Sequence, residues 1–253
     1  MLMKKRANCI KSIRCLKVQA SLQPDSSEAY LNMSNFLLLN GLDEEAINIC
    51  KQGLQINSDD EYLINNLLIG YVNSERFDIA LEYLTKYIEK YPNASVYWKL
   101  LGDIFCQIGE DKGAIICYKK ALDINSEDIC EVKQDIYYGL GICYAQVGEV
   151  KKSIEFYEKI LKYNHTDPIV LLNVSKLYGY DLKEYEKAEY YAKKVIELYP
   201  QNGYGYHNLG LIYLHTARLE KAKWYLYKAR RLIPEYQPVH DAIVELKRKQ
   251  YVF

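Results

Sequence analysis

The chain has 253 residues, of which 26% are charged, and its 33 Lys and Arg residues balance its 33 Asp and Glu residues. A neutral total charge gives no general attraction to nucleic acid or to a membrane surface, so neither is expected as a partner. Seven Cys residues, an odd number without CxxC spacing, favour a reducing compartment over a disulfide framework. The start of the chain has no apolar run of signal-peptide length, and no segment approaches a membrane span. We therefore expect a soluble, cytoplasmic protein.

The charges are unevenly distributed along the chain. Residues 1–17 hold six Lys and Arg residues and no acid, and residues 218–253 hold nine against four acids. Residues 18–217 hold 18 basic residues against 29 acidic ones. Local surfaces of either sign are therefore expected even though the total charge is zero.

Residues 1–24 are predicted to form a single helix, because apolar residues recur on one face from Ile10 to Ala20 and Pro24 ends the segment. The segment looks like the second helix of a pair whose first helix is absent. We interpret it as an N-terminal half-repeat or a capping helix, and we favour a half-repeat that continues a longer protein.

From residue 27 onward the sequence predicts consecutive pairs of antiparallel helices, each about 34 residues long. The predicted pairs occupy residues 27–60, 61–94, 95–128, 134–167, 168–202 and 203–236. Five extra residues, 129–133, form an insertion that most simply lengthens the adjoining helices by about a turn. A last helix over residues 237–253 is expected to cap the open end of the stack.

The pair over residues 95–128 shows the pattern most clearly. Its first helix carries residues at i, i+3, i+4 and i+7, namely Trp98, Leu101, Gly102 and Phe105. Gly109 breaks this pattern, and Ala114 and later apolar residues start a second helix. Small residues stand at the position of Ala114 in the other pairs, namely Ala46, Ala80, Ser153, Ala188 and Ala222. We expect the two helices of each pair to approach closely at these positions.

This arrangement resembles the tetratricopeptide repeat, in which an aromatic residue, Leu-Gly and Tyr mark the first helix and Ala, an aromatic residue and Ala mark the second. The resemblance covers about nine tenths of the chain. It implies an all-α fold, a right-handed superhelical solenoid of antiparallel helix pairs whose first helices line a concave groove. It also implies a repeat protein that acts as a scaffold or adaptor in protein binding.

The sequence predicts no catalytic site, no metal site and no cofactor site. The GLG at residues 139–141 lacks the third glycine and the preceding strand of a nucleotide loop, and Gly141 already has a role in helix packing. His207 and His215 lie eight residues apart on one helix face, too far apart to share one ion. We interpret them as polar groove residues.

One slot of the first helices holds four asparagines, Asn32, Asn66, Asn173 and Asn208, with Leu100 and Gly139 in the third and fourth pairs. An amide offers two donors and an acceptor, which suit the backbone of an extended peptide. Asparagine ladders at this slot do this in several relatives, so the resemblance implies a peptide-binding role. The alternative, in which these amides only bond within the repeats, stays open.

Other residues at slots that the resemblance places on the groove are Tyr62, Lys99, Tyr138, Ile142, Tyr204, His207 and Leu211. This mainly apolar and aromatic strip favours a peptide or helix with apolar anchors. Relatives that bind acidic chaperone tails use paired Lys and Asn, then Lys with Arg. Only Lys99 matches here, beside Asp103, so a carboxylate clamp is not expected.

The leading hypothesis is a non-enzymatic protein-protein interaction scaffold that binds a peptide or helical segment of a partner in the concave groove. The alternative is the peptide-sensing domain of a regulator whose effector domain is absent from this chain. An enzyme with an appended repeat array would need a catalytic domain that this sequence does not contain. Assembly into a homo-oligomer stays open.

Overall fold

The computed structural model describes residues 26–124 and 130–251, which form helices joined by short turns and contain no strand. The all-α class predicted from the sequence is therefore confirmed. The helix predicted over residues 1–24 lies outside the described residues, as does residue 129 of the predicted insertion. Among the described residues, no helix combines the length and the apolar character needed to cross a bilayer.

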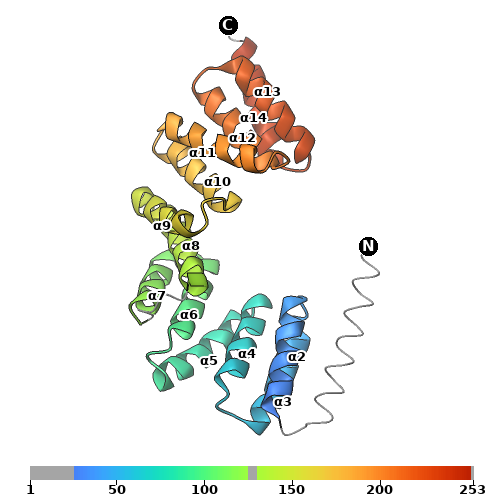
Figure 1. Ribbon diagram of the computed structural model, residues 1–253, viewed down its shortest axis with the longest axis vertical. Coiled ribbons are helices and arrows are strands. Elements are labelled where there is room, and N and C mark those ends of the chain that lie inside the picture. Colours follow the sequence, from blue (N-terminus) through green and yellow to red (C-terminus); the bar gives the residue numbers. More distant parts are fainter. Residues whose placement is uncertain (1–25, 125–129, 252–253) are drawn as a thin grey trace, which may run out of the picture. The chain divides into compact units, whose positions relative to one another are not determined.

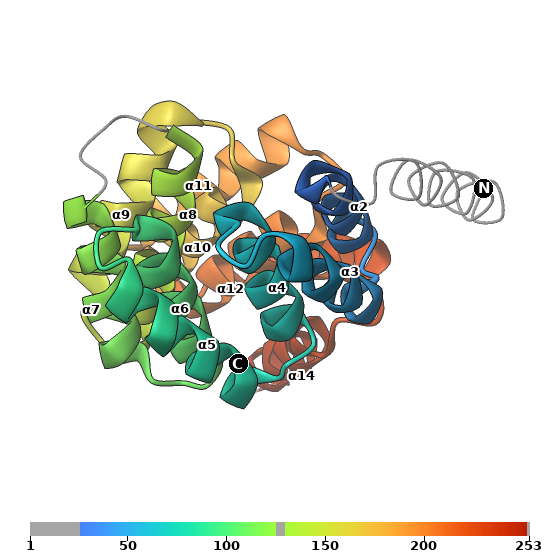
Figure 2. The same cartoon turned by 90° about the horizontal axis from the view of Figure 1, so that it is seen from below.

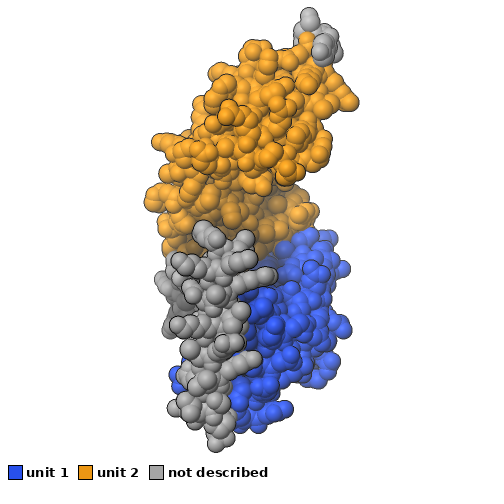
Figure 3. Space-filling model, turned by 90° about the vertical axis from the view of Figure 1, so that its right-hand side faces the viewer, with its two compact units in different colours: residues 1–128 blue, residues 129–253 orange. Residues whose placement is uncertain are grey.

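The chain divides into two compact units, residues 1–128 and 129–253, which Figure 3 colours separately. The helices of unit 1 are α2 (Ser27–Leu39), α3 (Asp43–Ile56), α4 (Glu61–Asn73), α5 (Phe77–Lys90), α6 (Ser95–Gln107) and α7 (Asp111–Ile124). Those of unit 2 are α8 (Cys130–Gln146), α9 (Val150–Tyr163), α10 (Pro168–Lys176), the π-helical turn η1 (Leu177–Asp181), α11 (Tyr185–Leu198), α12 (Gly203–His215), α13 (Leu219–Leu232) and α14 (Gln237–Tyr251).

Helices that follow one another in the sequence pack side by side within each unit. Both ribbon views show α2 beside α3 and α6 beside α7 (Figure 1, Figure 2), and α12 packs extensively on α13. Each of these pairs is joined by a turn of only three residues, so its two helices run in opposite directions. The repeating element is therefore the antiparallel helix pair that the sequence predicts.

Several first helices begin at a polar capping residue. Asp60 accepts hydrogen bonds from two backbone N–H groups of α4 at 3.2 and 3.1 Å. Asp167 caps α10 and Asn202 caps α12 in the same way. These bonds satisfy donors that have no partner inside the first turn of a helix. Ser26 stands at the start of α2, but its side chain makes no capping bond.

The turn inside each helix pair contains one residue with a positive φ angle. These residues are Gly41, Glu75, Gly109, Gly148, Lys183 and Ala217. They are spaced along the sequence by the same steps as the small residues from Ala46 to Ala222. Glycine adopts this left-handed backbone without steric cost, whereas the other three residues adopt it with a side chain in place.

The small residues from Ala46 to Ala222 are fully buried, as expected for close contact between helices. On the facing helix, a Cβ atom added to Gly141 would lie 2.6 Å from the Tyr157 ring, and one added to Gly210 would lie 2.5 Å from Leu226. A large side chain of the second helix thus rests directly on the backbone of the first. This contact fixes how closely the two helices of a pair pack.

Two irregularities interrupt the regular pairs in unit 2. Helix α8 has 17 residues, four more than α6 or α12, and it includes most of the predicted insertion. The fifth predicted pair has one extra residue after α10, and the chain accommodates it as the π-helical turn η1, in which the N–H of Leu182 donates to the carbonyl of Leu177 at 3.1 Å. A π turn of this kind absorbs one additional residue without ending the helix.

Each unit buries its own apolar core. In unit 1 the core runs from Ile47 to Ile104, and in unit 2 it runs from Ile154 to Leu246. Leu246 on α14 is 1% exposed, so the last helix belongs to the core of unit 2. Helix α14 thus lies against α12 and α13, where it can form one wall of a site.

Candidate functional site

A hollow of about 520 Å³ lies in unit 2 between α10 with η1, α12 and α14. Helix α12 lines it with His207, Asn208, Leu211, Ile212 and His215. The preceding segments contribute Ser175, Lys176, Gly179, Tyr180 and Tyr185. The C-terminal part contributes Tyr236, Pro238, Asp241, Ala242 and Glu245. The first helices of two successive pairs and the terminal helix therefore surround one space.

His207 is one of two buried polar residues of this hollow, with only 6% of its surface exposed, and Ser175 is the other. Burial lowers the pKa of the imidazole below its ordinary value of 6.5, and a hydrogen bond to the backbone of Pro238 opposes this effect. Since a proline backbone can only accept, the ring donates its N–H there. The other nitrogen, Nε2, has no hydrogen-bond partner among the described residues. In a neutral ring this nitrogen is an unpaired acceptor, and it is closed to solvent in the folded chain.

Aromatic rings and charged groups line other parts of the hollow. The ring of Tyr180 lies edge-on to His215, with 5.7 Å between their centroids. The carboxylate of Asp241 accepts a hydrogen bond from Gln237 at 2.9 Å, and Glu245 pairs with a lysine of its own helix at 3.0 Å. The hollow thus combines apolar side chains with polar groups that could orient a ligand.

Three residues predicted from the sequence line the hollow, namely His207, Asn208 and Leu211. His215, interpreted as a polar groove residue, lines it as well. Asn173 and three other predicted residues of unit 2 lie outside it. Tyr204 is 45% exposed and stands edge-on to Tyr236 at 5.1 Å, Tyr138 stands edge-on to Tyr157 at 5.9 Å, and Ile142 is partly buried.

The asparagine amides of unit 2 make hydrogen bonds to the preceding repeat. The Nδ2 group of Asn173 donates to the hydroxyl of Tyr157 at 3.3 Å, and that of Asn208 donates to the carbonyl of Leu172 at 3.3 Å. Each of these bonds uses one of the two N–H groups of an amide. The role of these amides in ligand binding stays a prediction, and the bonds add a structural role.

In unit 1 the predicted residues have varied surroundings. Asn66 is buried, and its Nδ2 group donates to Ser34 at 2.9 Å and to Asn35 at 2.6 Å. Asn32 is exposed. Tyr62 is 73% exposed. The ammonium group of Lys99 lies 3.1 Å from the carboxylate of Asp103.

Sequence reasoning missed the wall that α14 supplies. Asp241, Ala242 and Glu245 follow one another at i, i+1 and i+4, the spacing of one helix face. That spacing is a weak signal, because any amphipathic helix carries residues at such intervals. From the sequence, the terminal helix is expected to cap the open end of the stack.

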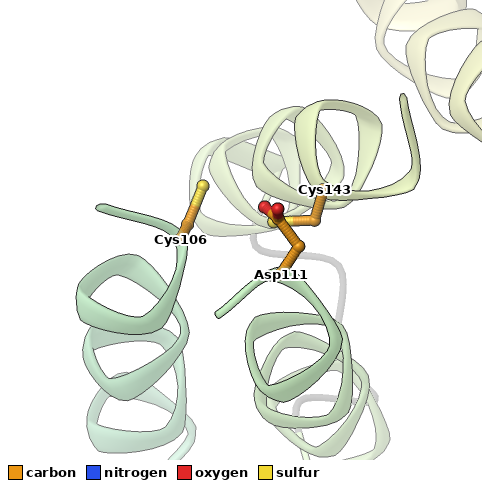
Figure 4. Close-up of side chains that lie close together, drawn as sticks. All are labelled: Cys106, Asp111 and Cys143. Atoms are coloured by element: carbon orange, nitrogen blue, oxygen red, sulfur yellow. The ribbon is translucent and has the colours of Figure 1, made fainter. Parts of the chain in front are cut away.

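Figure 4 shows three further side chains with metal-binding atoms and the helices that carry them. Cys106 comes from the end of α6, Asp111 is the first residue of α7, and Cys143 lies on α8. Because Cys106 and Asp111 belong to unit 1 and Cys143 to unit 2, we assign them no joint role.

Models of the tetratricopeptide repeat match residues 67–129, 134–166, 170–202 and 191–223, which together span more than half of the chain. The chain belongs to the tetratricopeptide repeat family. The family's fold is consistent with a protein-interaction scaffold and explains the regular helix pairs of both units.

Among the relatives of this tetratricopeptide repeat chain is the TPR repeat-containing protein MJ1428 of Methanocaldococcus jannaschii, which is 36% identical over 101 residues. That match covers 39% of this chain and 16% of the relative, so the chain matches about a sixth of the relative's length. Two of the solved structures that share the fold illustrate the likeness. PilF of Pseudomonas aeruginosa is 18% identical with a TM-score of 0.73, covering 88% of this chain and 99% of PilF. YrrB, whose structure is described as having an unusual peptide-binding site, is 17% identical with a TM-score of 0.53. This match covers 90% of this chain and 96% of YrrB.

Proposed function

We propose that this chain is a non-enzymatic scaffold that binds an extended or helical segment of a partner protein in the hollow between α10, α12 and α14. The observation that carries this proposal is the unpaired Nε2 atom of His207 in a hollow of about 520 Å³. A buried acceptor without a partner costs free energy, and a ligand that supplies a donor removes that cost.

A peptide matches the chemistry of this hollow. A turn of the imidazole on binding brings the buried Nε2 of His207 to a backbone N–H of the peptide, and an apolar side chain packs against Leu211. Asn208 keeps one amide N–H and its carbonyl oxygen for a second backbone group, because its hydrogen bond to Leu172 uses only one N–H. An extended segment offers such N–H and C=O groups at regular intervals.

Unit 1 contains a second unpaired acceptor at the equivalent place in the repeat. The Oδ1 atom of Asn65 is buried and has no hydrogen-bond partner among the described residues. Asn65 and His207 both stand one residue after the aromatic or aliphatic residue that opens the repeat pattern, at Ile64 and Tyr206. The same slot thus holds a buried acceptor without a partner in each unit, which a turn of the side chain brings to a ligand, and this supports peptide binding along the first helices. The likeness to YrrB, a protein with a peptide-binding site, agrees with this proposal.

The test begins with a displayed library of random 12-residue peptides selected against the purified chain. Fluorescence anisotropy then measures the affinity of the enriched peptides for the wild type and for His207→Phe, which keeps an aromatic ring and removes the acceptor. We expect His207→Phe to weaken binding about tenfold, the loss typical of one hydrogen bond in a desolvated site.

The matched control is His165→Phe, because His165 is an exposed histidine of the same unit outside the hollow. It should leave the affinity unchanged. Hydrogen exchange with the peptide bound should slow in α10, α12 and α14. Equal affinity of wild type and His207→Phe, or protection confined to other helices, would contradict the proposal.

A further inference from the structure

A second surface of unit 2 centres on Trp224 of α13. It is distinct from the hollow beside α14. Its side chain is 59% exposed. Two further hollows, of about 540 and 550 Å³, are both lined by Trp224 and Glu220, and they share no residue with the hollow beside α14. Large exposed aromatic side chains are unfavourable in water and are enriched where partners bind. We call Lys221, Lys223, Trp224, Tyr227, Lys228 and Arg231 the α13 face.

The same slot of the preceding pair also exposes an aromatic ring. Tyr190 stands two residues after Ala188, as Trp224 stands two residues after Ala222, and it is 61% exposed. Each ring lies edge-on to the next residue of its helix: Trp224 to Tyr225 at 4.7 Å, and Tyr190 to the residue after it at 5.2 Å. The outer side of α11 and α13 therefore presents exposed aromatic rings in one repeated geometry.

Helix α13 carries the strongest positive charge of the second helices. It has five Lys and Arg residues and one acid, Glu220, whereas α11 carries three of each sign. No carboxylate among the described residues pairs with Lys223, Lys228 or Arg231. These cations are available to an anionic partner, since no internal salt bridge has to break first.

A rigid frame holds the surface around Trp224. The ring of Tyr225 lies 5.2 Å from that of Tyr213, whose hydroxyl donates to Glu189 on α11 at 2.8 Å. Arg218 donates to the same carboxylate at 2.9 Å. Side chains from α11, α12 and α13 are thus tied together beneath one of the two hollows. A surface organised before binding loses little conformational entropy when a partner docks.

We propose that the α13 face is a second interaction surface, which binds an acidic peptide segment carrying an aromatic or aliphatic anchor. The anchor packs on Trp224, and the acidic side chains pair with Lys223, Lys228 and Arg231. Glu220 lines both hollows and repels a polyanion with evenly spaced charges, whereas a peptide can place a backbone N–H against it. The surface therefore suits a segment of mixed acidic and apolar character better than a nucleic acid backbone.

The test uses Trp224 as its own reporter. The chain has two tryptophans, so Trp98→Phe leaves Trp224 as the only indole. The probe is a 12-residue peptide of Asp and Glu around a central Leu-Phe pair, titrated at about 50 mM salt, where surface charges are weakly screened. We expect the Trp224 emission to shift to shorter wavelength and its quenching by acrylamide to fall. The same peptide with Asn and Gln in place of the acids should bind at least tenfold more weakly.

Two pairs of variants separate a specific surface from total charge. Lys223→Glu with Lys228→Glu should weaken binding of the acidic peptide at least tenfold. Lys151→Glu with Lys162→Glu, both exposed residues of α9, makes the same change in charge and should change the affinity less than twofold. Leu211→Ser, in the hollow beside α14, should leave this binding unchanged, so failure of one site is distinguishable from failure of the other.

Several results would overturn the proposal. One is an absence of any Trp224 response to the acidic peptide, and another is an equal loss of binding in the α9 control. A Trp224 response to a thymidine 20-mer or to phosphatidylserine vesicles, without one to the peptide, would assign the surface to a different class of partner. A concentration-dependent dimer that Trp224→Ser abolishes would assign it to a second copy of this chain.

Discussion

The ring of His207 lies edge-on to the ring of Tyr236, with 5.4 Å between their centroids. Tyr236 comes directly before α14, and Pro238 in that helix contacts the same imidazole. The start of the terminal helix therefore helps to hold the ring of His207 in place. The terminal helix, which the sequence predicts as a cap, thus also completes the candidate site.

The lowered pKa of His207 predicts a pH dependence of stability. In the unfolded chain this histidine takes up a proton near pH 6.5, whereas burial in the folded chain opposes protonation. As the pH falls below about 6.5 the unfolded state therefore binds more protons, and the free energy of unfolding decreases. His207→Phe removes this contribution. Urea denaturation between pH 7.5 and 5 should show a steeper loss of stability in the wild type than in the variant, and equal slopes would refute this.

The glycines that face a large side chain should not tolerate a methyl group. Gly141→Ala and Gly210→Ala each place a Cβ atom at about 2.6 Å or less from the facing helix. We expect a loss of about 1 to 3 kcal/mol in the free energy of unfolding, the usual cost of overpacking. Alanine in an unconstrained helix stabilises relative to glycine. Chemical denaturation gives the sign of the change in the free energy of unfolding. A gain in stability would show that the two helices can move apart without cost.

At the turns inside the helix pairs, we expect substitution by glycine to stabilise the fold. Lys183 and Ala217 adopt φ angles of 56° and 55°. Lys183→Gly and Ala217→Gly should each raise the free energy of unfolding by about 0.5 to 1 kcal/mol, because glycine removes the steric cost of this conformation. The matched change is Gly109→Ala at a φ of 80°, which should destabilise by a similar amount. Thermal unfolding measures these changes. If all three substitutions shifted the free energy of unfolding in the same direction, the assigned turn geometry would be wrong.

Glu189 predicts a second pH dependence, in the acidic range. Burial alone raises the pKa of this carboxyl, but hydrogen bonds from Lys193, Tyr213 and Arg218 outweigh it and lower the pKa from 4.5 to about 2. Stability from these bonds is present above pH 4.5 and is lost as the pH falls toward 2. Arg218→Met should therefore reduce the free energy of unfolding by about 1 kcal/mol at pH 7. Its difference from wild type should shrink by pH 2.5, and a constant difference would argue against the charged carboxylate as the cause.

The sequence was sufficient to predict the all-α class and the close contacts within each helix pair. The signal is strong because one physical requirement recurs: a small residue such as Ala114 or Ala222 must stand where two helices meet, and such a residue occurs in all six pairs. Even the extra residue after α10 could be placed at the turn where η1 forms. Its conformation could not be predicted, since a looser loop would satisfy the same pattern.

The candidate site was only partly predictable. His207, Asn208 and Leu211 follow from their slots on a first helix, but the unpaired state of Nε2 depends on where the backbone of Pro238 lies. That position results from packing of α14 on α12, which no local pattern encodes. Similarly, an amide such as Asn66 offers its donors to any neighbour, and the sequence does not reveal that Ser34 and Asn35 accept them.

The most direct test of peptide binding in the hollow is a nitrogen-15 NMR measurement of the histidine side chains with an enriched library peptide added. The chain has four histidines, so selective labelling gives a simple spectrum. We predict that the Nε2 resonance of His207 moves upfield, as an acceptor nitrogen does when it gains a hydrogen bond, while His165 does not change. A peptide that binds tightly and leaves the His207 resonance unchanged would contradict this account.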